Sequence, residues 1–427
     1  MPRKEHNSKK KVRRPMFSLH RTLFVGIFVA TAIPLAYAIP GVFTVEYQAP
    51  GIVEGSRNVE VIPEKPIVLH LDTPVPLRAI YMSQCVVGTP SFRDSLVKLI
   101  DETELNAVVI DIKDYTGKLG FSTDNPLLMG SVSDQCGARD MYDFIKRLHA
   151  KGIYTIARIT VFQDPYYTEL RPDLAVKKAS DKTTWNDYKG LAFVDVGARD
   201  FWDYIIEISK EAYALGFDEL NYDYIRFPSD GPMKDVYYSH SQNVTKADQL
   251  EHFFAYLNEQ LTDKTAFPEG RVPVLSADIF GMTTTNTDDL NIGQVLERTL
   301  PYFDYISPMV YPSHYPQGFN NWSNPNQYPY EIVNFSMSSA VARAIATTTS
   351  VYAFVHTPLS TTTPIVFEKP AYEASKLRPW LQDFDYGGNY DIEEVQAQMR
   401  ATYDSGLDSW MLWDPSNRYT RGALGAE

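Results

Sequence analysis

Eight short apolar runs recur along this chain, and each of them ends in polar or charged residues. They are rich in branched and aromatic side chains. Near-continuous apolar strands of this kind are typical of parallel sheets that are covered on both faces. The runs lie at residues 79–83, 107–114, 154–160, 219–228, 274–281, 305–314, 378–383 and 409–414.

Stretches with apolar residues at helical spacing separate most of these runs. Alternating strands and helices build right-handed crossover units. No Gly-rich phosphate loop follows the first strand, which disfavours an open dinucleotide-binding sheet. The pattern predicts an α/β fold, a closed (β/α)8 TIM barrel with long loops on its C-terminal face. The expected helices lie at 91–104, 140–151, 200–215, 248–261, 292–300, 330–346 and 392–405.

The N-terminal 40 residues differ from the rest of the chain. The first 21 hold eight Lys or Arg and one Glu, about +7, which leaves about −20 for the remainder of a chain with net charge −13. An uncharged apolar stretch follows at 22–39. It fits a signal peptide cleaved at the small residues Ala36 and Ala38, or an uncleaved membrane anchor of marginal length. The long basic flank, which stays in the cytoplasm, favours the anchor.

We therefore expect three parts: a signal segment at 1–40, a spacer rich in Pro and Gly at 41–76 and the barrel at 77–427. The barrel would lie outside the cytoplasm, either membrane-anchored or secreted. Its acidic character excludes nucleic acid as a partner. In that environment Cys85 and Cys136 either form a disulfide or remain two thiols.

Acidic side chains end most of the predicted strands. In a parallel barrel these ends meet at one rim, where barrel enzymes have their active sites. A buried carboxylate is costly unless it is paired or used, and for Asp223 the simple alternative is an ion pair with Arg226 that only closes the strand. Long connections at 162–192, 229–245 and 312–330 would surround the same rim. The carboxylates are those of Asp111, Asp114, Asp223, Asp278, Asp383 and Asp414.

The residue types at these strand ends restrict the chemistry. The chain has neither a Gly-x-Ser-x-Gly nucleophile motif nor a Cys/His cluster with zinc spacing, and we expect no metal and no cofactor. Aromatic residues make up 13% of the sequence. Two carboxyl groups that flank a scissile bond, with rings that stack on sugars, are what glycoside hydrolysis requires. The pattern therefore predicts a glycosidase with a carbohydrate substrate.

Five motifs resemble, in the same order, a bacterial glycoside hydrolase domain family that was formerly a domain of unknown function. The resemblance covers about residues 77–420 and implies a barrel and a sugar substrate. The motifs are VIDIKD at 109–114, GFDELNYDYIRFP at 216–228, SADIFG at 276–281, YISPMVYPSHY at 305–315 and WMLWDPSN at 410–417.

This family is distantly similar to the α-amylase and α-galactosidase barrels. The resemblance implies a nucleophilic Asp at the end of the fourth strand, here Asp223. In the amylase-like layout it also implies the acid at the end of the fifth strand, here Asp278, and a stabilising Asp at the end of the seventh, here Asp383. The chain departs from that layout twice, because residue 278 is Asp rather than Glu and because Asn221, not Arg, stands two residues before Asp223.

These observations predict a role for each candidate residue. Asp223 would attack the anomeric carbon, and Arg226 or Lys113 would keep it ionised. Asp278 would protonate the leaving oxygen and later activate water, which requires a raised pKa. The aromatic members of the remaining substrate-binding set would stack on sugar rings. That set contains Asp111, Tyr311, His314, Trp380, Gln382, Asp383, Trp413 and Asp414.

Two other functions fit the same sequence. The first is a catalytically silent barrel that binds cell-envelope polysaccharide through the same aromatic cleft, since binding and hydrolysis share one site. The second is a membrane-tethered scaffold for envelope proteins that uses the long loops as an interface. A flat loop face without a carboxylate-lined cleft would favour the scaffold.

Overall fold

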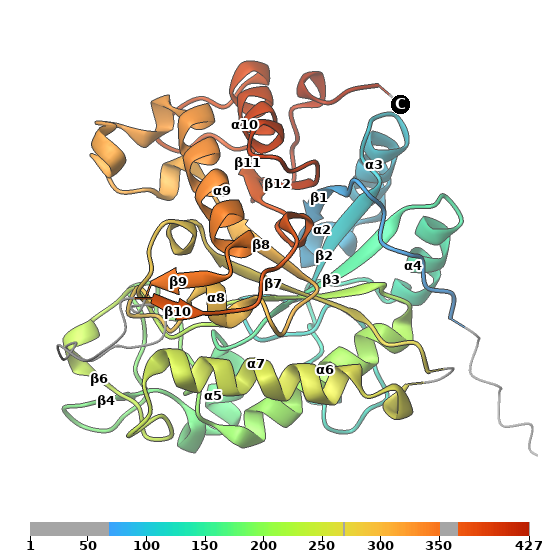
Figure 1. Ribbon diagram of the computed structural model, residues 1–427. Helices are drawn as coiled ribbons and strands as arrows, with labels where there is room; N and C mark the ends of the chain where they lie inside the picture. Colours follow the sequence, from blue (N-terminus) through green and yellow to red (C-terminus); the bar gives the residue numbers. More distant parts are fainter. Residues whose placement is uncertain (1–67, 268–269, 351–365, 427) are drawn as a thin grey trace, which may run out of the picture. The chain divides into compact units, whose positions relative to one another are not determined.

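Eight parallel strands close into one barrel in this computed structural model, which describes residues 68–267, 270–350 and 366–426 (Figure 1). Each strand pairs with the barrel strand before it and the one after it in the chain, and the last pairs with the first. All eight overlap predicted runs, so the predicted (β/α)8 fold is confirmed. The strands are β1 (Arg78–Met82), β2 (Ala107–Lys113), β3 (Tyr154–Thr160), β5 (Glu219–Asp223), β7 (Val274–Phe280), β8 (Tyr305–Met309), β11 (Trp380–Gln382) and β12 (Trp410–Trp413).

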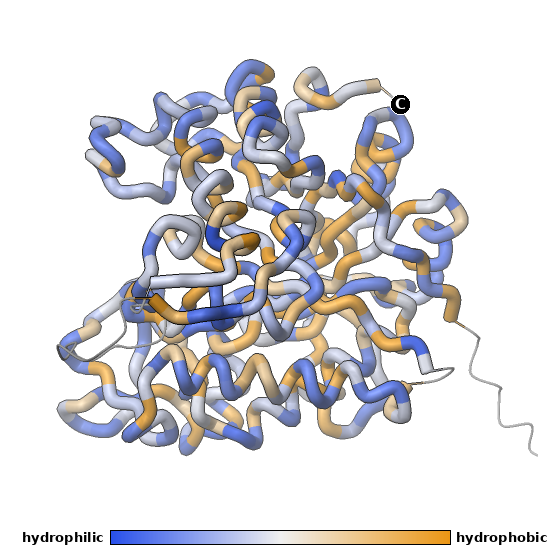
Figure 2. Tube along the Cα trace, in the orientation of Figure 1, coloured by the Kyte–Doolittle hydropathy of each residue, from blue (hydrophilic) through white to orange (hydrophobic). Residues whose placement is uncertain are grey.

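Helices connect the strands and cover the outside of the barrel (Figure 1). Their hydrophobic faces pack on the strands, and hydrophobic and hydrophilic residues alternate along them in Figure 2. Six of the predicted helices are confirmed with ends shifted by no more than a few residues. They are α3 (Pro90–Asp101), α4 (Met141–His149), α6 (Arg199–Leu215), α7 (Lys246–Thr262), α9 (Pro329–Ile345) and α10 (Ile392–Asp404).

The helix predicted at 292–300 is wrong for its first half, because only α8 (Leu296–Thr299) is helical. Gly293 has a left-handed φ of 87°, which a right-handed helix does not accept. Next to it, the side-chain oxygen of Gln294 accepts the backbone N–H of Phe280 at 2.9 Å. The apolar spacing therefore reflects burial of a loop rather than a helix face.

The hydrophobic core has two layers. One fills the space between strands and helices, and a smaller one fills the inside of the barrel. Strand β5 shows how the two are divided, since Leu220 and Tyr222 belong to the outer layer. Side chains alternate along a strand, so Glu219, Asn221 and Asp223 point into the barrel. The inner face of β5 is therefore entirely polar.

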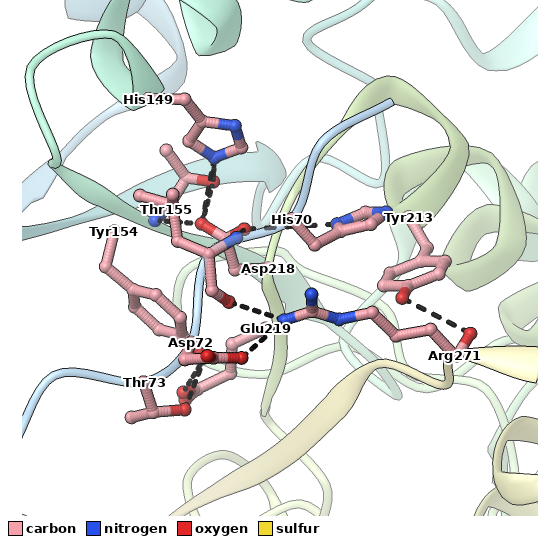
Figure 3. A network of polar contacts seen from close by, with 11 residues as sticks. His70, Asp72, Thr73, His149, Tyr154, Thr155, Tyr213, Asp218, Glu219 and Arg271 are labelled. Carbon is pink, nitrogen blue, oxygen red and sulfur yellow. Dashed lines mark hydrogen bonds and ion pairs between the residues drawn. The ribbon is translucent and has the colours of Figure 1, made fainter. Parts of the chain in front are cut away.

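A polar network closes the N-terminal end of the barrel (Figure 3). The backbone N–H of Leu71 donates to Oδ1 of Asp218 at 2.7 Å, and the other oxygen accepts bonds from Thr155 and His149. The ring of His70 stacks on Tyr213 with centroids 3.9 Å apart. The end of the predicted spacer, from residue 70 onward, thus packs on the barrel bottom.

Long loops lie at the opposite rim, as predicted. The loop after β3 contains α5 (Pro165–Leu170) and β4 (Lys177–Lys178), and β4 pairs with β6 (Val236–Tyr237) of the loop after β5. The chain also contains the antiparallel strand pair β9 (Thr348–Ser350) and β10 (Val366–Glu368). Cys85, in the short helix α2 (Gln84–Val87), forms a disulfide with Cys136.

Residues 1–40 and most of the predicted spacer lie outside the described residues, and so does the predicted signal peptide or anchor. Within 68–267, 270–350 and 366–426, no helix combines the length and the hydrophobicity needed to span a membrane.

Candidate active site

Arg158 connects two of the predicted carboxylates at the C-terminal rim. It lies on β3, and its guanidinium donates Nη1–H to Oδ1 of Asp111 at 2.9 Å and Nη2–H to Oδ2 of Asp223. The hydroxyl of Tyr81 donates to the other oxygen of Asp111 at 2.9 Å. Burial raises the pKa of Asp111 to about 6, against the opposing charge of Arg158. The ion pair with Arg158 holds the Asp223 side chain in place.

The backbone beside Asp223 also has an unusual conformation. Tyr224 has a φ of 51°, in the left-handed region that side chains of this size rarely adopt. Its N–H donates to Oδ1 of Asp223 at 2.6 Å. Such backbone strain concentrates at functional sites, where the surrounding structure compensates for it. The backbone N–H of Tyr224 and the guanidinium of Arg158 therefore each hold one oxygen of the Asp223 carboxylate.

Asp278, near the end of β7, has the opposite environment. Its side chain is buried, and Oδ1 accepts the Nδ2–H of Asn221 at 2.9 Å and the Nε1–H of Trp380 at 2.8 Å. Burial raises the pKa of Asp278 to about 8, and the negative charge of Asp223 adds to the shift. Both effects favour the protonated form of this carboxyl group. Since Oδ1 already accepts two hydrogen bonds, the proton belongs on Oδ2.

The strand register explains why these side chains meet. Arg158 is paired with Asn221, and Asn221 with Ser276, so the three form one level of the barrel. Asp223 and Asp278 each come two residues later, and they form the next level toward the rim. Asn221 itself carries no charge, and the neighbouring strand β3 supplies a guanidinium at the same level.

A cavity of about 310 Å³, which we call the central cavity, opens above these carboxyl groups. The stacked rings of Tyr311 and Trp413 form part of its wall, with centroids 5.3 Å apart. His314 packs against Tyr311, and loss of solvent together with the charge of Lys189 lowers the pKa of His314. The predicted residues that line the central cavity are Asp223, Asp278, Arg226, Tyr311, His314, Trp380 and Trp413.

A second cavity of about 560 Å³, the wide cavity, adjoins the central one. The two cavities share part of their walls. The long loops supply Asp187, Lys189 and Asp230, and the predicted residue Asp111 lies in the wall of the wide cavity. The residues that line both cavities are Arg158, Lys189, Tyr224, Arg226 and Trp413.

The predicted charge partners of Asp223 are placed differently from the expectation. Lys113 is fully buried and pairs with Asp164 at 2.8 Å, which prevents it from reaching Asp223. Among the described contacts, Arg226 makes no ion pair with a carboxylate, and its Nη1–H donates to the backbone oxygen of Phe227. Within the described part of the chain, the ion-pair partner of Asp223 is Arg158, not Lys113 or Arg226.

Three further predicted residues are absent from the described walls of both cavities. The carboxylate of Asp383 accepts an N–H and an O–H bond from Thr420, and burial raises the pKa of Asp383 to about 7. Gln382 accepts the backbone N–H of Ser313 at 3.1 Å. Asp414 accepts N–H groups of its own loop. In this structure these side chains hold the backbone that surrounds the site.

Arg158, Asn221 and Tyr224 were not among the predicted site residues. A sequence signal existed for Arg158, because a lone arginine inside the apolar run 154–160 must have a partner when it is buried. For Asn221 and Tyr224 the signal lies only in the strand register and in the backbone conformation. Trp380 was predicted to stack on sugars, but its ring is buried and its N–H bonds Asp278.

Comparisons with known proteins identify the family of this chain. A family model described as "putative glycosyl hydrolase domain" matches residues 79–419. This match confirms the predicted family and, with it, the predicted enzyme class, a glycosidase. No curated protein is significantly similar to the chain. Within the described residues, no group of three or more His, Cys, Asp or Glu side chains is placed to hold a metal ion.

Several solved structures are similar to this chain. The alpha-L-fucosidase isoenzyme 2 from Paenibacillus thiaminolyticus is 10% identical with a TM-score of 0.53, and the match covers 82% of this chain and 48% of that chain. A hypothetical protein from Ruminiclostridium thermocellum ATCC 27405 is 33% identical with a TM-score of 0.40, over 47% of this chain and 96% of that chain. An alpha-galactosidase from Thermus thermophilus is 12% identical with a TM-score of 0.44, over 82% and 60%. Because the fucosidase is only 10% identical to this chain, the similarity shows the barrel fold alone.

Proposed function

We propose, from the premise that this chain belongs to the putative glycosyl hydrolase domain family, that it hydrolyses an oligosaccharide or polysaccharide through Asp223 and Asp278. The observation that carries this proposal is the contrast between two neighbouring carboxyl groups. One is ion-paired with Arg158, and the other is buried with a raised pKa. Environments that separate the protonation states of two carboxyl groups divide a glycosidase pair into a base or nucleophile and an acid.

Asp223 is the nucleophile in this proposal. Its carboxylate attacks the anomeric carbon, and the bond from that carbon to the leaving oxygen breaks. Arg158 positions the attacking group, because it holds Asp223 and Asp111 at once and cannot rotate freely. Tyr81 completes the arrangement through its bond to Asp111.

Asp278 is the general acid and then the general base. Its Oδ2 gives a proton to the leaving oxygen as the glycosidic bond breaks. The resulting carboxylate is stabilised by the N–H groups of Asn221 and Trp380 on Oδ1. It next takes a proton from the water that cleaves the glycosyl–enzyme bond, which restores both carboxyl groups.

The adjoining cavities support a substrate of more than one sugar. Each cavity lies within the range of about 300–1,000 Å³ that is common for ligand sites. Exposed aromatic rings lie in and beside these cavities. Tyr115 lines the wide cavity, and the ring centroid of Tyr386 lies 6.3 Å from that of His314. Such rings are suited to stack on successive sugars. A carboxylate-lined cleft of this shape is unlike the flat loop face that a scaffold would use.

We also propose that the barrel lies outside the cytoplasm, as a membrane-anchored or secreted domain. The basic and apolar N-terminal sequence supports this placement. The disulfide between Cys85 and Cys136 supports it as well, because disulfides persist mainly in oxidising compartments.

The test is a hydrolysis screen of the full chain against aryl glycosides and cell-envelope polysaccharides, with the Asp278→Asn variant alongside. Loss of the acid should lower the rate on natural glycans about 10²–10⁴-fold. An activated aryl leaving group needs no proton, so it should restore most of the first step. NMR of the first product would give the stereochemistry. Binding without turnover across the screen would instead identify a silent carbohydrate-binding barrel.

A further inference from the structure

Arg226 is a buried cation whose charge has no close partner. Arg226 is 8% exposed, and the described contacts include no carboxylate within ion-pair distance. The guanidinium carbon lies 4.9 Å from the ring centroid of Tyr224 and 4.7 Å from that of Phe280, so the group is clamped between two rings. Burial lowers the pKa of Arg226, and the charges of Asp223, Asp187 and Asp230 offset only part of this loss of solvent.

The donors of Arg226 face the two cavities. Nη1–H bonds to the carbonyl oxygen of Phe227 at 3.1 Å, while the other N–H groups have no protein acceptor among the described residues. Arg226 lines the central and the wide cavity, and Lys189 lies in the same shared wall. A rigid guanidinium fork with free donors matches the geometry of a carboxylate or a related oxyanion.

The charges around the central cavity also favour an anionic ligand. Arg158 shares one positive charge between Asp111 and Asp223, which leaves that trio with one net negative charge. Arg226 and Lys189 add two positive charges, and Asp278 is neutral when protonated. Three carboxylates act on Arg226 without forming an ion pair with it. Asp223 lines the central cavity and is already counted in the trio, while Asp187 and Asp230 line only the wide cavity.

This balance is unfavourable for a neutral substrate. The glycosidic transition state resembles an oxocarbenium ion, so positive charge develops at the sugar that occupies the central cavity. Two additional cations nearby oppose that charge. An anionic group on the substrate would pair with the cations and remove the opposition.

We propose that the central cavity recognises a sugar that carries an anionic substituent, a carboxylate or a sulfate, and that Arg226 and Lys189 bind this group. The inference rests on the proposed function, since it names the substrate class of the same site. It also assigns Arg226 as a residue that determines specificity, in contrast to Arg158, which positions Asp223.

The experiment measures binding of the full chain to matched glycans. Polygalacturonate, alginate and hyaluronan are each compared with the same polymer after chemical reduction of its carboxylates to alcohols. Carrageenan and its desulfated form provide the sulfate comparison. We expect the parent to bind at least one charged polymer about 10–100-fold more tightly than its neutral counterpart, as for hydrogen bonds to a charged group.

Variants show which residue is responsible. Arg226→Gln should remove most of the preference, Arg226→Lys should keep part of it, and Lys189→Gln should reduce it less. Arg147→Gln, the same change on the exposed surface of α4, should leave it unaltered. Equal binding of charged and neutral polymers, no binding of any charged polymer, or an unchanged preference in Arg226→Gln would each overturn the proposal.

Hydrolysis of the same polymers separates this proposal from the proposed function. Charged polymers that bind through Arg226 without being cleaved would support the anion site and count against hydrolysis. Neutral polymers that are cleaved without any preference for charge would support hydrolysis and overturn the anion site.

Discussion

The two ends of β5 both carry buried acids, and they differ in what remains free. At the N-terminal end, Asp218 precedes the strand, and both of its oxygens accept bonds from Leu71, Thr155 and His149 (Figure 3). At the C-terminal end, Asp223 and its neighbour Asp278 face the central cavity. Only one oxygen of Asp278 has donors among the described residues.

Burial of a carboxylate is therefore a poor guide to function by itself. The acid at the bottom has protein donors on both oxygens and lines neither of the two cavities. The acids at the top face the central cavity, and Asp278 keeps one oxygen without a described donor, which is what a reaction can use. The comparison predicts that changes at the bottom alter stability and that changes at the top alter rate.

The largest effect is expected for Asp223→Asn. The amide keeps the shape of the side chain but removes the nucleophile, so the rate should fall by roughly 10⁴-fold or more. The melting temperature should stay close to that of the parent. Steady-state kinetics together with thermal unfolding measures both, and a variant that unfolds early would show that Asp223 belongs to the structural class instead.

The next largest effect is expected for Asp218→Ala. This change leaves the N–H groups of Leu71 and Thr155 and the ring of His149 without their acceptor, and the free energy of unfolding should fall by about 3–5 kcal/mol. In the fraction that remains folded, the rate constant should match the parent. Urea unfolding and kcat per folded molecule are the measurements. A large loss of kcat with normal stability would contradict the division between the two ends.

Much of the fold could be predicted from sequence because it depends on local patterns. Buried parallel strands are near-continuous apolar runs, and their order in the chain is also their order around the barrel. The failure at 292–300 has a local cause, since Gly293 takes a left-handed conformation. Apolar spacing reports burial, and it does not distinguish a helix from a buried loop that is held by side chains such as Gln294.

The candidate site was only partly predictable, because it depends on which residues of neighbouring strands are paired with each other. The strand ends identified Asp223 and Asp278 from sequence alone. The partner of Asp223 could not be identified in that way, since Arg158 lies one strand away and is brought level by the pairing of β3 with β5. For the same reason, Lys113 was a plausible partner in sequence but pairs with Asp164 in the structure.

A smaller effect is expected for Arg158→Gln, which tests the positioning of the nucleophile. The loss of its charge-assisted bonds to Asp111 and Asp223 should lower kcat about 10²-fold with a smaller change in KM. Because Arg158 opposes the raised pKa of Asp111, that pKa should rise further in the variant. Arg158→Lys should recover part of kcat. A variant with parental kcat would show that the ion pair is only structural.

The smallest effect is the pH dependence of the parent, and it tests the acid at the top. Asp278 must be protonated to act first, and its pKa is raised to about 8 by burial and by the charge of Asp223. The active form is therefore present below that pH and is lost above it, so kcat/KM on a natural glycan should fall about tenfold per pH unit beyond 8. An activated aryl glycoside should show a shallower decline when glycosylation limits the rate, because its leaving group needs no proton.

In Asp278→Asn the decline should disappear on both substrates, since no proton remains to be lost. A parental profile that falls with the same slope and midpoint in Asp278→Asn would assign the titration to another group, and Asp383, with a pKa raised to about 7, would be the next to examine.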